Sequence, residues 1–433
     1  MRPYPSAVCL IIYLVTICFS SHMRAASAPQ KDPVHAEKPK ETPLNSASAK
    51  PAASAAVLGA RLVTLDPLTR KAVNHLYDLE YDKAIADLER VVQAHPTDPF
   101  ARNYLLQAVV FKEMYRLNAL DTTLYADDGF LTGKPLPADP KVKERIQSIA
   151  EASLRLSEER LKTNPQDVDA LYARGVTRGL RLSFAAIVEK SFFAALKNAI
   201  ASRNDHERVL QLDPTYTNAK LIVGMHNYVI GSLPFGMRLL VGITGMSGSK
   251  KKGIELLQAV AAAPVETNPD ARVALALFLR REAKYKDALA IAHSLAAERP
   301  KNFIFALEEA NLLKDSGLGS EAIDAYRRIL AQAKSGLFTD PHLERAAFGL
   351  AESLKGQRLA DDALKAYQQA LAFPNLEAEV KVRCHLGAGQ MYDVLQKRDS
   401  ALKEYQSAIQ LDPDSNHAGE ARKFLRQPYR YSS

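Results

Sequence analysis

The stretch that decides the fold is VRCHLGAGQMYDVLQKRDSALKEYQSAIQLDPDS, residues 382–415. Within these 34 residues Gly389 stands at position 8, Ala401 at position 20, Tyr405 at position 24 and Pro413 at position 32. Small residues at positions 8 and 20 let two antiparallel helices approach closely, and a bulky residue at position 24 packs into the next unit. Proline at position 32 ends the second helix. The stretch therefore predicts one pair of antiparallel helices.

The same frame recurs upstream, so this stretch is one unit of an internal repeat. The matching residues of the earlier units are Ala363 with Tyr367, Ala322 with Tyr326, Ala288 with Pro300, and Ala84 with Leu88 and Pro96. In the middle of the chain Gly175 marks a first helix whose partner is delayed and runs to Pro214. No sustained apolar–polar alternation with hairpin turns follows Arg61, so we expect no sheet.

At these positions the chain resembles the tetratricopeptide repeat family. The resemblance implies an all-α fold, a right-handed helical solenoid of about seven helix pairs in which each pair contacts mainly its neighbours. We expect this solenoid over residues 59–415, with a central irregular insertion at about 232–252. Residues 416–433 are expected to form a capping helix and a tail.

The first twenty residues are typical of a secretory signal peptide. Arg2 is followed by a 13-residue apolar stretch at 7–19, which is shorter than the roughly 20 residues that a membrane-spanning helix needs. We expect an exported protein, periplasmic if its source is a diderm bacterium and secreted otherwise; an uncleaved membrane anchor is the alternative. Residues 21–58 hold five prolines and no aromatic residue, so they are predicted to form a disordered tether.

The composition excludes several classes of protein. With 47% hydrophobic and 24% charged residues, the 433-residue chain is neither mostly disordered nor a protein with many membrane spans. Two of its three cysteines, Cys9 and Cys18, lie in the predicted signal, which leaves Cys384 as an expected core thiol. The net charge of +8 is mild, and basic residues alternate with acidic ones along most helices. We therefore expect no nucleic acid partner.

Residues 224–257 depart from the repeat pattern. Between Ser232 and Gly253 there are four basic residues, five glycines and no acidic residue. The segment contains Ser232-Leu233-Pro234, Leu239-Leu240 and Gly245-Met246-Ser247-Gly248. In these residues it resembles a segment of the inclusion-body-clearance family and its animal tetratricopeptide relatives. The resemblance implies a helix, a turn, an apolar helix and a glycine-containing turn, built into a helical architecture.

Three interpretations of this segment stay open. It is an apolar hairpin packed on the solenoid, or an element that docks a partner or touches a membrane, since apolar surface beside positive charge suits anionic lipid. The third, phosphate binding, conflicts with GITGMSGSK, which lacks the glycine-lysine-hydroxyl order of a phosphate loop. The candidate contact residues are Met225, Tyr228, Arg238, Lys250, Lys251 and Lys252.

The sequence predicts no catalytic, cofactor-binding or metal-binding residue. The ten histidines are scattered without an HExxH motif, and we interpret His206 and His226 as polar helix residues rather than as zinc ligands. GxSxG is absent, so a hydrolase nucleophile has no candidate. Asp127 and Asp128 are interpreted as a solvated turn rather than as a catalytic carboxylate pair.

Positions 5 and 9 of the first helices show whether the repeats can grip an acidic C-terminal peptide. The resemblance implies lysine and asparagine there in a protein that binds such peptides. The residues found are Leu386 and Gln390, Phe348 and Glu352, and Leu221 and Met225. We therefore expect a mixed, partly apolar inner face that suits a helix or an extended peptide.

The leading hypothesis is an exported, non-enzymatic scaffold that binds a protein or peptide on the concave face of the solenoid. An alternative is an envelope-associated protein that contacts lipid or an apolar ligand through residues 232–252. A second alternative is an enzyme whose site lies in the central region.

Overall fold

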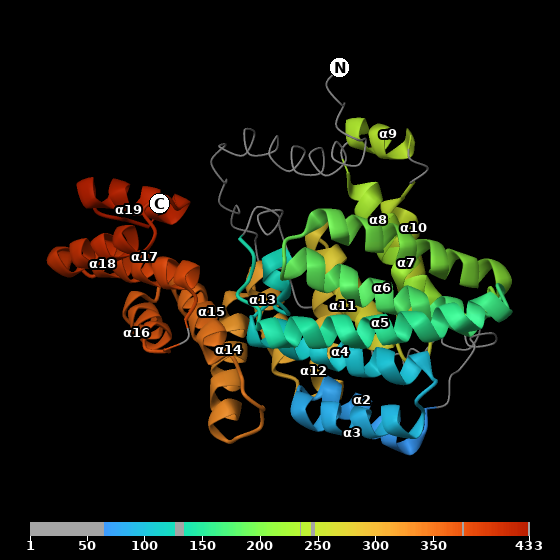
Figure 1. The fold of residues 1–433 in the computed structure, drawn as a ribbon. Coiled ribbons are helices and arrows are strands. Elements are labelled where there is room, and N and C mark those ends of the chain that lie inside the picture. Colours follow the sequence, from blue (N-terminus) through green and yellow to red (C-terminus); the bar gives the residue numbers. More distant parts are fainter. Residues whose placement is uncertain (1–64, 126–133, 234, 244–246, 375, 432–433) are drawn as a thin grey trace, which may run out of the picture. The chain divides into compact units, whose positions relative to one another are not determined.

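The computed structural model describes residues 65–125, 134–233, 235–243, 247–374 and 376–431 (Figure 1). The predicted signal peptide, the predicted tether, Asp127 and Asp128 lie outside the described residues. Every regular element in these ranges is a helix and none is a strand, which confirms the all-α prediction.

The helices follow one another with short connections. They are α2 (Pro67–Tyr77), α3 (Tyr81–Ala94), α4 (Pro99–Arg116), η2 (Thr122–Tyr125), α5 (Pro140–Thr163), α6 (Val168–Ile187), α7 (Phe192–Leu212), η4 (Thr217–Ala219), α8 (Lys220–Ser232), α9 (Phe235–Ile243), α10 (Lys250–Ala261), α11 (Asn268–Arg281), α12 (Tyr285–Glu298), α13 (Phe303–Asp315), α14 (Gly319–Lys334), α15 (Leu343–Gly356), α16 (Ala360–Leu371), α17 (Ala378–Val394), α18 (Arg398–Leu411) and α19 (Asn416–Arg426).

The chain divides into two compact units. The central unit consists of Met1–Asp66, Val92–Val110 and Asp128–Leu275, and the C-terminal unit consists of Pro67–Val91, Phe111–Asp127 and Ala276–Ser433. The C-terminal unit thus combines stretches that are far apart in sequence. Within it, Asn302 Nδ2 donates a hydrogen bond of 2.7 Å to the Tyr77 carbonyl across 225 residues of chain. Most contacts in this unit nonetheless join helices that are neighbours in sequence, which confirms that each helix pair contacts mainly its neighbours.

Stacked antiparallel pairs build most of the C-terminal unit, namely α13 with α14, α15 with α16, and α17 with α18, covered by α19 (Figure 1). The position-24 tyrosines Tyr326, Tyr367 and Tyr405 are fully buried. A Cβ atom added to Gly349 would clash with the Tyr326 ring, and one added to Gly387 would clash with the Tyr367 ring. Each of these two tyrosines therefore packs against the first helix of the following pair, as the repeat frame predicts.

The turn inside each helix pair repeats one backbone geometry. Position 15 of five pairs is in the left-handed region, with φ of 61° at Leu79, 56° at Ala283, 77° at Gly317, 59° at Arg358 and 59° at Gln396. The next N–H returns to the carbonyl five residues back in every case, for example from Leu318 to Leu313 at 3.0 Å. This pattern is the Schellman motif, which ends a helix and reverses the chain.

The main helix contacts of the central unit are those of α5 with α6, α6 with α7, and α8 with α10. The delayed second helix is confirmed as α7, which ends at Leu212. Gly175 of α6 lies against the His206 ring of α7. In this pair a glycine and a histidine therefore make the contact that small residues at positions 8 and 20 make in the regular repeats. A buried polar cluster links α4, α5 and α6, since the Thr177 hydroxyl donates to Asn103 Oδ1 at 2.7 Å and the Ser153 hydroxyl to the same atom at 3.1 Å.

The predicted insertion, at about 232–252, contains the helix α9. Ser232 ends α8, and Lys250 begins α10, so residues 233–249 connect the two paired helices and include α9. The α8 and α10 backbones touch through glycine. A Cβ atom on Gly253 would lie 2.6 Å from the Tyr228 nitrogen and 2.7 Å from the Gly224 carbonyl oxygen. No larger residue would fit at this crossing.

Candidate functional site

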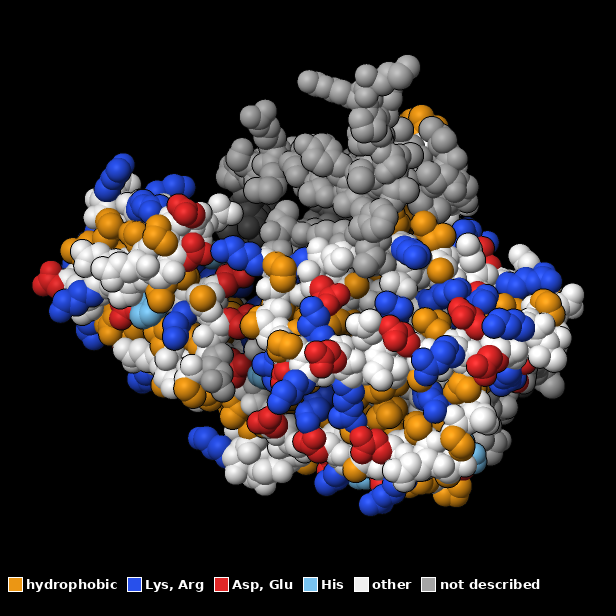
Figure 2. All heavy atoms as spheres, in the orientation of Figure 1, with side chains coloured by type: hydrophobic (Ala, Val, Ile, Leu, Met, Phe, Trp, Pro, Cys, Tyr) orange, Lys and Arg blue, Asp and Glu red, His pale blue; other side chains and the backbone are white. Residues whose placement is uncertain are grey.

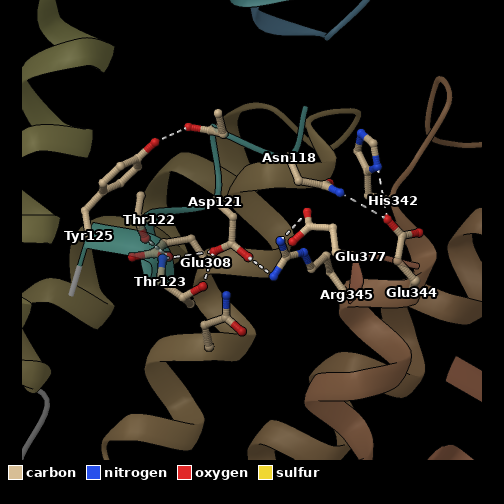
Figure 3. A network of polar contacts seen from close by, with 12 residues as sticks. Asn118, Asp121, Thr122, Thr123, Tyr125, Glu308, His342, Glu344, Arg345 and Glu377 are labelled. Atoms are coloured by element: carbon tan, nitrogen blue, oxygen red, sulfur yellow. Dashed lines mark hydrogen bonds and ion pairs between the residues drawn. The ribbon is translucent and has the colours of Figure 1, made fainter. Parts of the chain in front are cut away.

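Three successive first helices of the C-terminal unit present charged side chains to one non-helical segment. Arg280 comes from α11, Glu308 from α13 and Arg345 from α15. All three contact residues 117–125, which follow α4 and include η2. Figure 3 shows Glu308 and Arg345 beside Asp121 and Thr122 of this segment. Because the three helices are the first members of consecutive pairs, these side chains lie on one face of the stack, which we call the inner face.

Hydrogen bonds and ion pairs join the segment to the inner face. The Thr122 hydroxyl donates to the Glu308 carboxylate, which also lies 3.4 Å from the Arg280 guanidinium. Asp121 Oδ2 lies 3.9 Å from Arg345 Nη1. Asp121 Oδ1 in turn accepts from the Thr123 N–H at 2.9 Å and thereby shapes the turn. All five groups are buried or partly buried, so the charges are held mainly by one another.

The inner face also binds the main chain of this segment. Arg281 Nη1 donates to the Tyr125 carbonyl at 2.9 Å. At the other end of the segment, Asn118 Nδ2 donates to Glu344 Oε1 at 3.4 Å. The Tyr115 hydroxyl at the end of α4 donates to the Asp340 carbonyl at 3.0 Å. The C-terminal unit thus holds this part of the chain by one main-chain bond, at Tyr125, and by side-chain bonds at Tyr115 and Asn118.

Burial dominates the electrostatics of this cluster. Burial raises the pKa of Glu308 to about 7, although Arg280 and the Thr122 hydroxyl act in the opposite direction. For Arg345, burial alone would lower the pKa, but the nearby carboxylates of Glu377 and Asp121 raise it overall. The arginine therefore stays charged, while Glu308 takes up a proton close to neutral pH.

The tail after α19 lies against α17 and the turn between α15 and α16. The Tyr429 N–H donates to Asp393 Oδ2 of α17 at 2.8 Å. The Tyr431 hydroxyl donates to the Met391 sulfur at 3.5 Å, and the Arg358 guanidinium lies 5.5 Å from the Tyr431 ring centre. Here again a side chain of a first helix binds a backbone group of a non-helical segment.

Positions 5 and 9 of the repeats lie on this same face. Arg345, Phe348 and Glu352 are spaced by three and four residues along α15, so they share one side of that helix. The Arg383 guanidinium of α17 stacks on the Phe348 ring at 4.6 Å. Gln390 is buried, and its Oε1 atom has no hydrogen-bond partner among the described residues. The face offers an aromatic–cation pair, an acid and an amide, in agreement with its predicted mixed character.

The insertion exposes apolar side chains rather than burying them. Phe235 is 76% exposed and Leu239 is 63% exposed on α9, while Val229 is 52% exposed and Met225 37% exposed on α8. The interpretation as an apolar hairpin packed on the solenoid is therefore wrong for Phe235 and Leu239.

The six residues predicted to contact a partner or lipid divide into surface and core. Met225, Arg238, Lys251 and Lys252 are exposed, and Lys250 is partly exposed. Tyr228 is 2% exposed, with the Lys250 ammonium group 5.9 Å from its ring centre. Tyr228 is thus a core residue between α8 and α10, and its selection as a contact residue was wrong.

The histidines and the thiol of the described residues are set apart from any reactive partner. Burial lowers the pKa of both His206 and His226 to about 4, so both rings are neutral at pH 7. His206 Nδ1 pairs with the Ser202 carbonyl at 2.8 Å. Burial raises the pKa of the Cys384 thiol to about 12. Within the described ranges, no three His, Cys, Asp or Glu side chains are grouped so that they could hold a metal ion.

Sequence reasoning missed the inner-face contacts with residues 117–125. The stretch Asp121-Thr122-Thr123 is a pattern typical of a side-chain-capped turn. That local signal predicts the turn but not its partners, because Glu308 is 186 residues away from Thr122.

No protein-family model and no curated protein matches the sequence. Among solved structures, the fold is similar to Cut9 in the APC/C hetero-tetramer Cut9–Hcn1, with 13% identity over 83% of this chain and 55% of that chain and a TM-score of 0.49. It is also similar to human IFIT1, solved as a dimer with m7Gppp-AAAA, with 13% identity, 84% of each chain covered and a TM-score of 0.43. Yeast Tom70 has 13% identity, with 83% of this chain and 87% of that chain covered and a TM-score of 0.39.

These structures are tetratricopeptide-type helical repeat proteins. The helix pairs, the position-24 tyrosines and the repeated turns described above assign the same type to this chain, which confirms the predicted fold class. The chain spans 55% of the length of Cut9.

Proposed function

We propose that this protein is a non-enzymatic scaffold that binds an extended segment of a partner protein on the concave, inner face of its C-terminal unit. The observation that carries the proposal is that first-helix side chains bind backbone groups of two short segments, one that ends in the 3-10 helix η2 and the tail after α19. Arg281 donates to the Tyr125 carbonyl, and Asp393 accepts from the Tyr429 N–H. Backbone hydrogen bonds hold a peptide without regard to its side chains, and pockets between them select the sequence.

The chemistry of the face favours a partner with both apolar and polar side chains. The stacked Phe348 and Arg383 offer a flat surface for an apolar or aromatic residue. The partly exposed carboxylate of Glu352 offers an acceptor to a peptide N–H or hydroxyl group. No lysine–asparagine pair is present at positions 5 and 9, so a terminal carboxylate is not the expected anchor.

Site-specific photocrosslinking tests where the partner binds. A photoreactive amino acid at Arg383 on the inner face is compared with one at Lys365, which is 75% exposed on the second helix α16. We expect a discrete protein crosslink from position 383 alone, with a higher yield when residues 428–433 are removed. Crosslinks of equal yield from both positions, or from position 365 only, contradict binding on the inner face.

We further propose that the protein acts outside the cytoplasm. The support is the apolar stretch at 7–19 behind Arg2, followed by the proline-rich residues 21–58. Intact mass and N-terminal sequencing of the protein from fractionated cells test this. A product that has lost about twenty residues supports a cleaved signal, whereas an intact N-terminus in the soluble cytoplasmic fraction rejects export.

A further inference from the structure

The helix α9 presents two large apolar side chains on one face. Phe235 and Leu239 are four residues apart, which places them one helical turn apart on the same side. Both are largely exposed, and on α8 Met225 and Val229 repeat the same four-residue spacing at the surface. Large apolar side chains exposed on consecutive turns mark an interaction site in a folded protein.

The charge of the same segment has one sign. Arg238, Lys251 and Lys252 are exposed, and no acidic residue stands between Ser232 and Gly253. The first acid beyond it, Glu255, lies 3.9 Å from the Lys251 ammonium group. Elsewhere, the basic and acidic side chains of the described helices are interleaved over the face shown in Figure 2. The segment therefore combines an apolar helix face with local positive charge.

The insertion is fixed at its base. A Cβ atom on Gly231 would lie 2.7 Å from the Ser249 carbonyl carbon, and one on Gly248 would lie 2.7 Å from the Asn227 carbonyl oxygen. The chain therefore leaves α8 and returns to α10 at nearly the same point. The segment that contains α9 is therefore attached to α8 at one end and to α10 at the other, and α9 lies past the ends of these two helices (Figure 1).

We propose that α9 and the first turn of α10 form an interfacial element that binds an anionic lipid bilayer. Phe235 and Leu239 enter the boundary between headgroups and acyl chains, and Arg238, Lys251 and Lys252 contact anionic headgroups. With nine residues, α9 is far shorter than a spanning helix. None of the described helices is long and apolar enough to cross a membrane.

The test uses the absence of tryptophan from the chain. Phe235→Trp in the full-length protein gives a single fluorescent reporter on α9, independent of the apolar stretch at 7–19. It is mixed with vesicles of equal parts phosphatidylglycerol and phosphatidylcholine, or of phosphatidylcholine alone. We expect a blue shift and quenching by bromine-labelled acyl chains with the anionic vesicles only. Leu411→Trp, at an exposed position of α18, is the matched control and should show neither effect.

Charge and apolar variants in the Phe235→Trp background complete the test. Lys251→Gln with Lys252→Gln should weaken vesicle partitioning about 25-fold, since each basic residue near an anionic surface contributes about a fivefold factor. Lys162→Gln with Lys197→Gln, at exposed positions of the same unit, should leave partitioning unchanged. Equal binding to neutral vesicles, or a blue shift that grows with protein concentration without lipid, overturns the proposal in favour of an apolar ligand or a second copy.

Discussion

At the scale of single residues, position 15 of five helix pairs has a left-handed backbone, which is unfavourable for residues other than glycine. Gly317 fills it in one pair, whereas Leu79, Ala283, Arg358 and Gln396 adopt the same left-handed backbone with a side chain. A side chain in this region costs roughly 1–2 kcal/mol because its Cβ atom approaches the following carbonyl oxygen. The repeats thus carry strain at four equivalent positions.

We predict that Gln396→Gly raises the free energy of unfolding by about 1 kcal/mol, because glycine has no Cβ atom to strain this turn. Urea denaturation followed by circular dichroism measures the change. The matched control is Gln410→Gly on the exposed side of α18, which should lower the stability by about 1 kcal/mol. If both variants lose stability, the turn at position 396 is not strained.

The buried Glu308 should make the stability of the protein depend on pH. Burial raises its pKa from 4.5 to about 7 in the folded state, so the native protein keeps a proton there that the unfolded chain has released. The stability contributed by this group is fully present below about 4.5 and is lost as the pH rises through about 7.

Relative to the wild type, Glu308→Gln should become more stable as the pH rises through this window, by up to about 1.4 kcal/mol per pH unit. Urea midpoints measured across the range test it. Glu420→Gln, at an exposed position of α19, is the control and should follow the wild type. Parallel pH profiles for Glu308→Gln and the wild type contradict a raised pKa.

At the scale of elements, a single arginine attaches the capping helix. Arg398 at the start of α18 pairs with the buried carboxylate of Asp393 at 2.8 Å. Its other nitrogen donates to the Phe424 and Leu425 carbonyls at 2.7 and 2.9 Å. The same side chain therefore neutralises a buried charge and satisfies the last turn of α19.

We predict that Arg398→Gln lowers the free energy of unfolding by about 3 kcal/mol, since it leaves the Asp393 charge buried without a cation. Hydrogen exchange should also become faster in α19. Arg327→Gln breaks an exposed ion pair with Asp362 at 3.9 Å and should change stability by less than about 1 kcal/mol. Unchanged exchange in α19 after Arg398→Gln would refute this role.

The helix pairs were predictable from sequence because their signal is local. Small residues and tyrosines recur at the same positions of successive units, and each makes its contact within its own pair or the next one. The contacts of residues 117–125 were not predictable. Asn118 meets Glu344 across 226 residues, and nothing in the sequence near either one indicates the other. Tyr228 was misjudged because an aromatic residue beside lysines fits a core and a surface equally well.

At the scale of the molecule, the C-terminal unit depends on chain segments outside its main stretch. Pro67–Val91 and Phe111–Asp127 belong to it together with Ala276–Ser433. Without these segments, the carboxylate of Glu308 loses the Thr122 hydroxyl, and Arg345 loses the carboxylate of Asp121. Glu308 keeps Arg280 and Arg345 keeps Glu377, so each group loses one of its partners. A hydrogen bond of this kind contributes about 0.5–1.5 kcal/mol to stability.

We therefore predict that a fragment beginning at Ala276 is partly destabilised. Amide hydrogen exchange in α13 and α15 should be at least tenfold faster than in the full chain, because about 1.4 kcal/mol of lost local stability has this effect. Exchange in α18 and α19 should be nearly unchanged and serves as the internal control. Full protection of α13 in the fragment would show that the added segments do not support it.

The bond from Asn302 to Tyr77 also sets an order of events during synthesis. A ribosome adds roughly 5–20 residues per second, so the 225 residues that separate these partners take about 10–45 s to make. During that interval the α2–α3 hairpin, with its apolar residues Leu76 and Leu88, has been made but its docking surface has not. The hairpin is therefore the part of the chain that most needs protection by chaperones while the rest is translated.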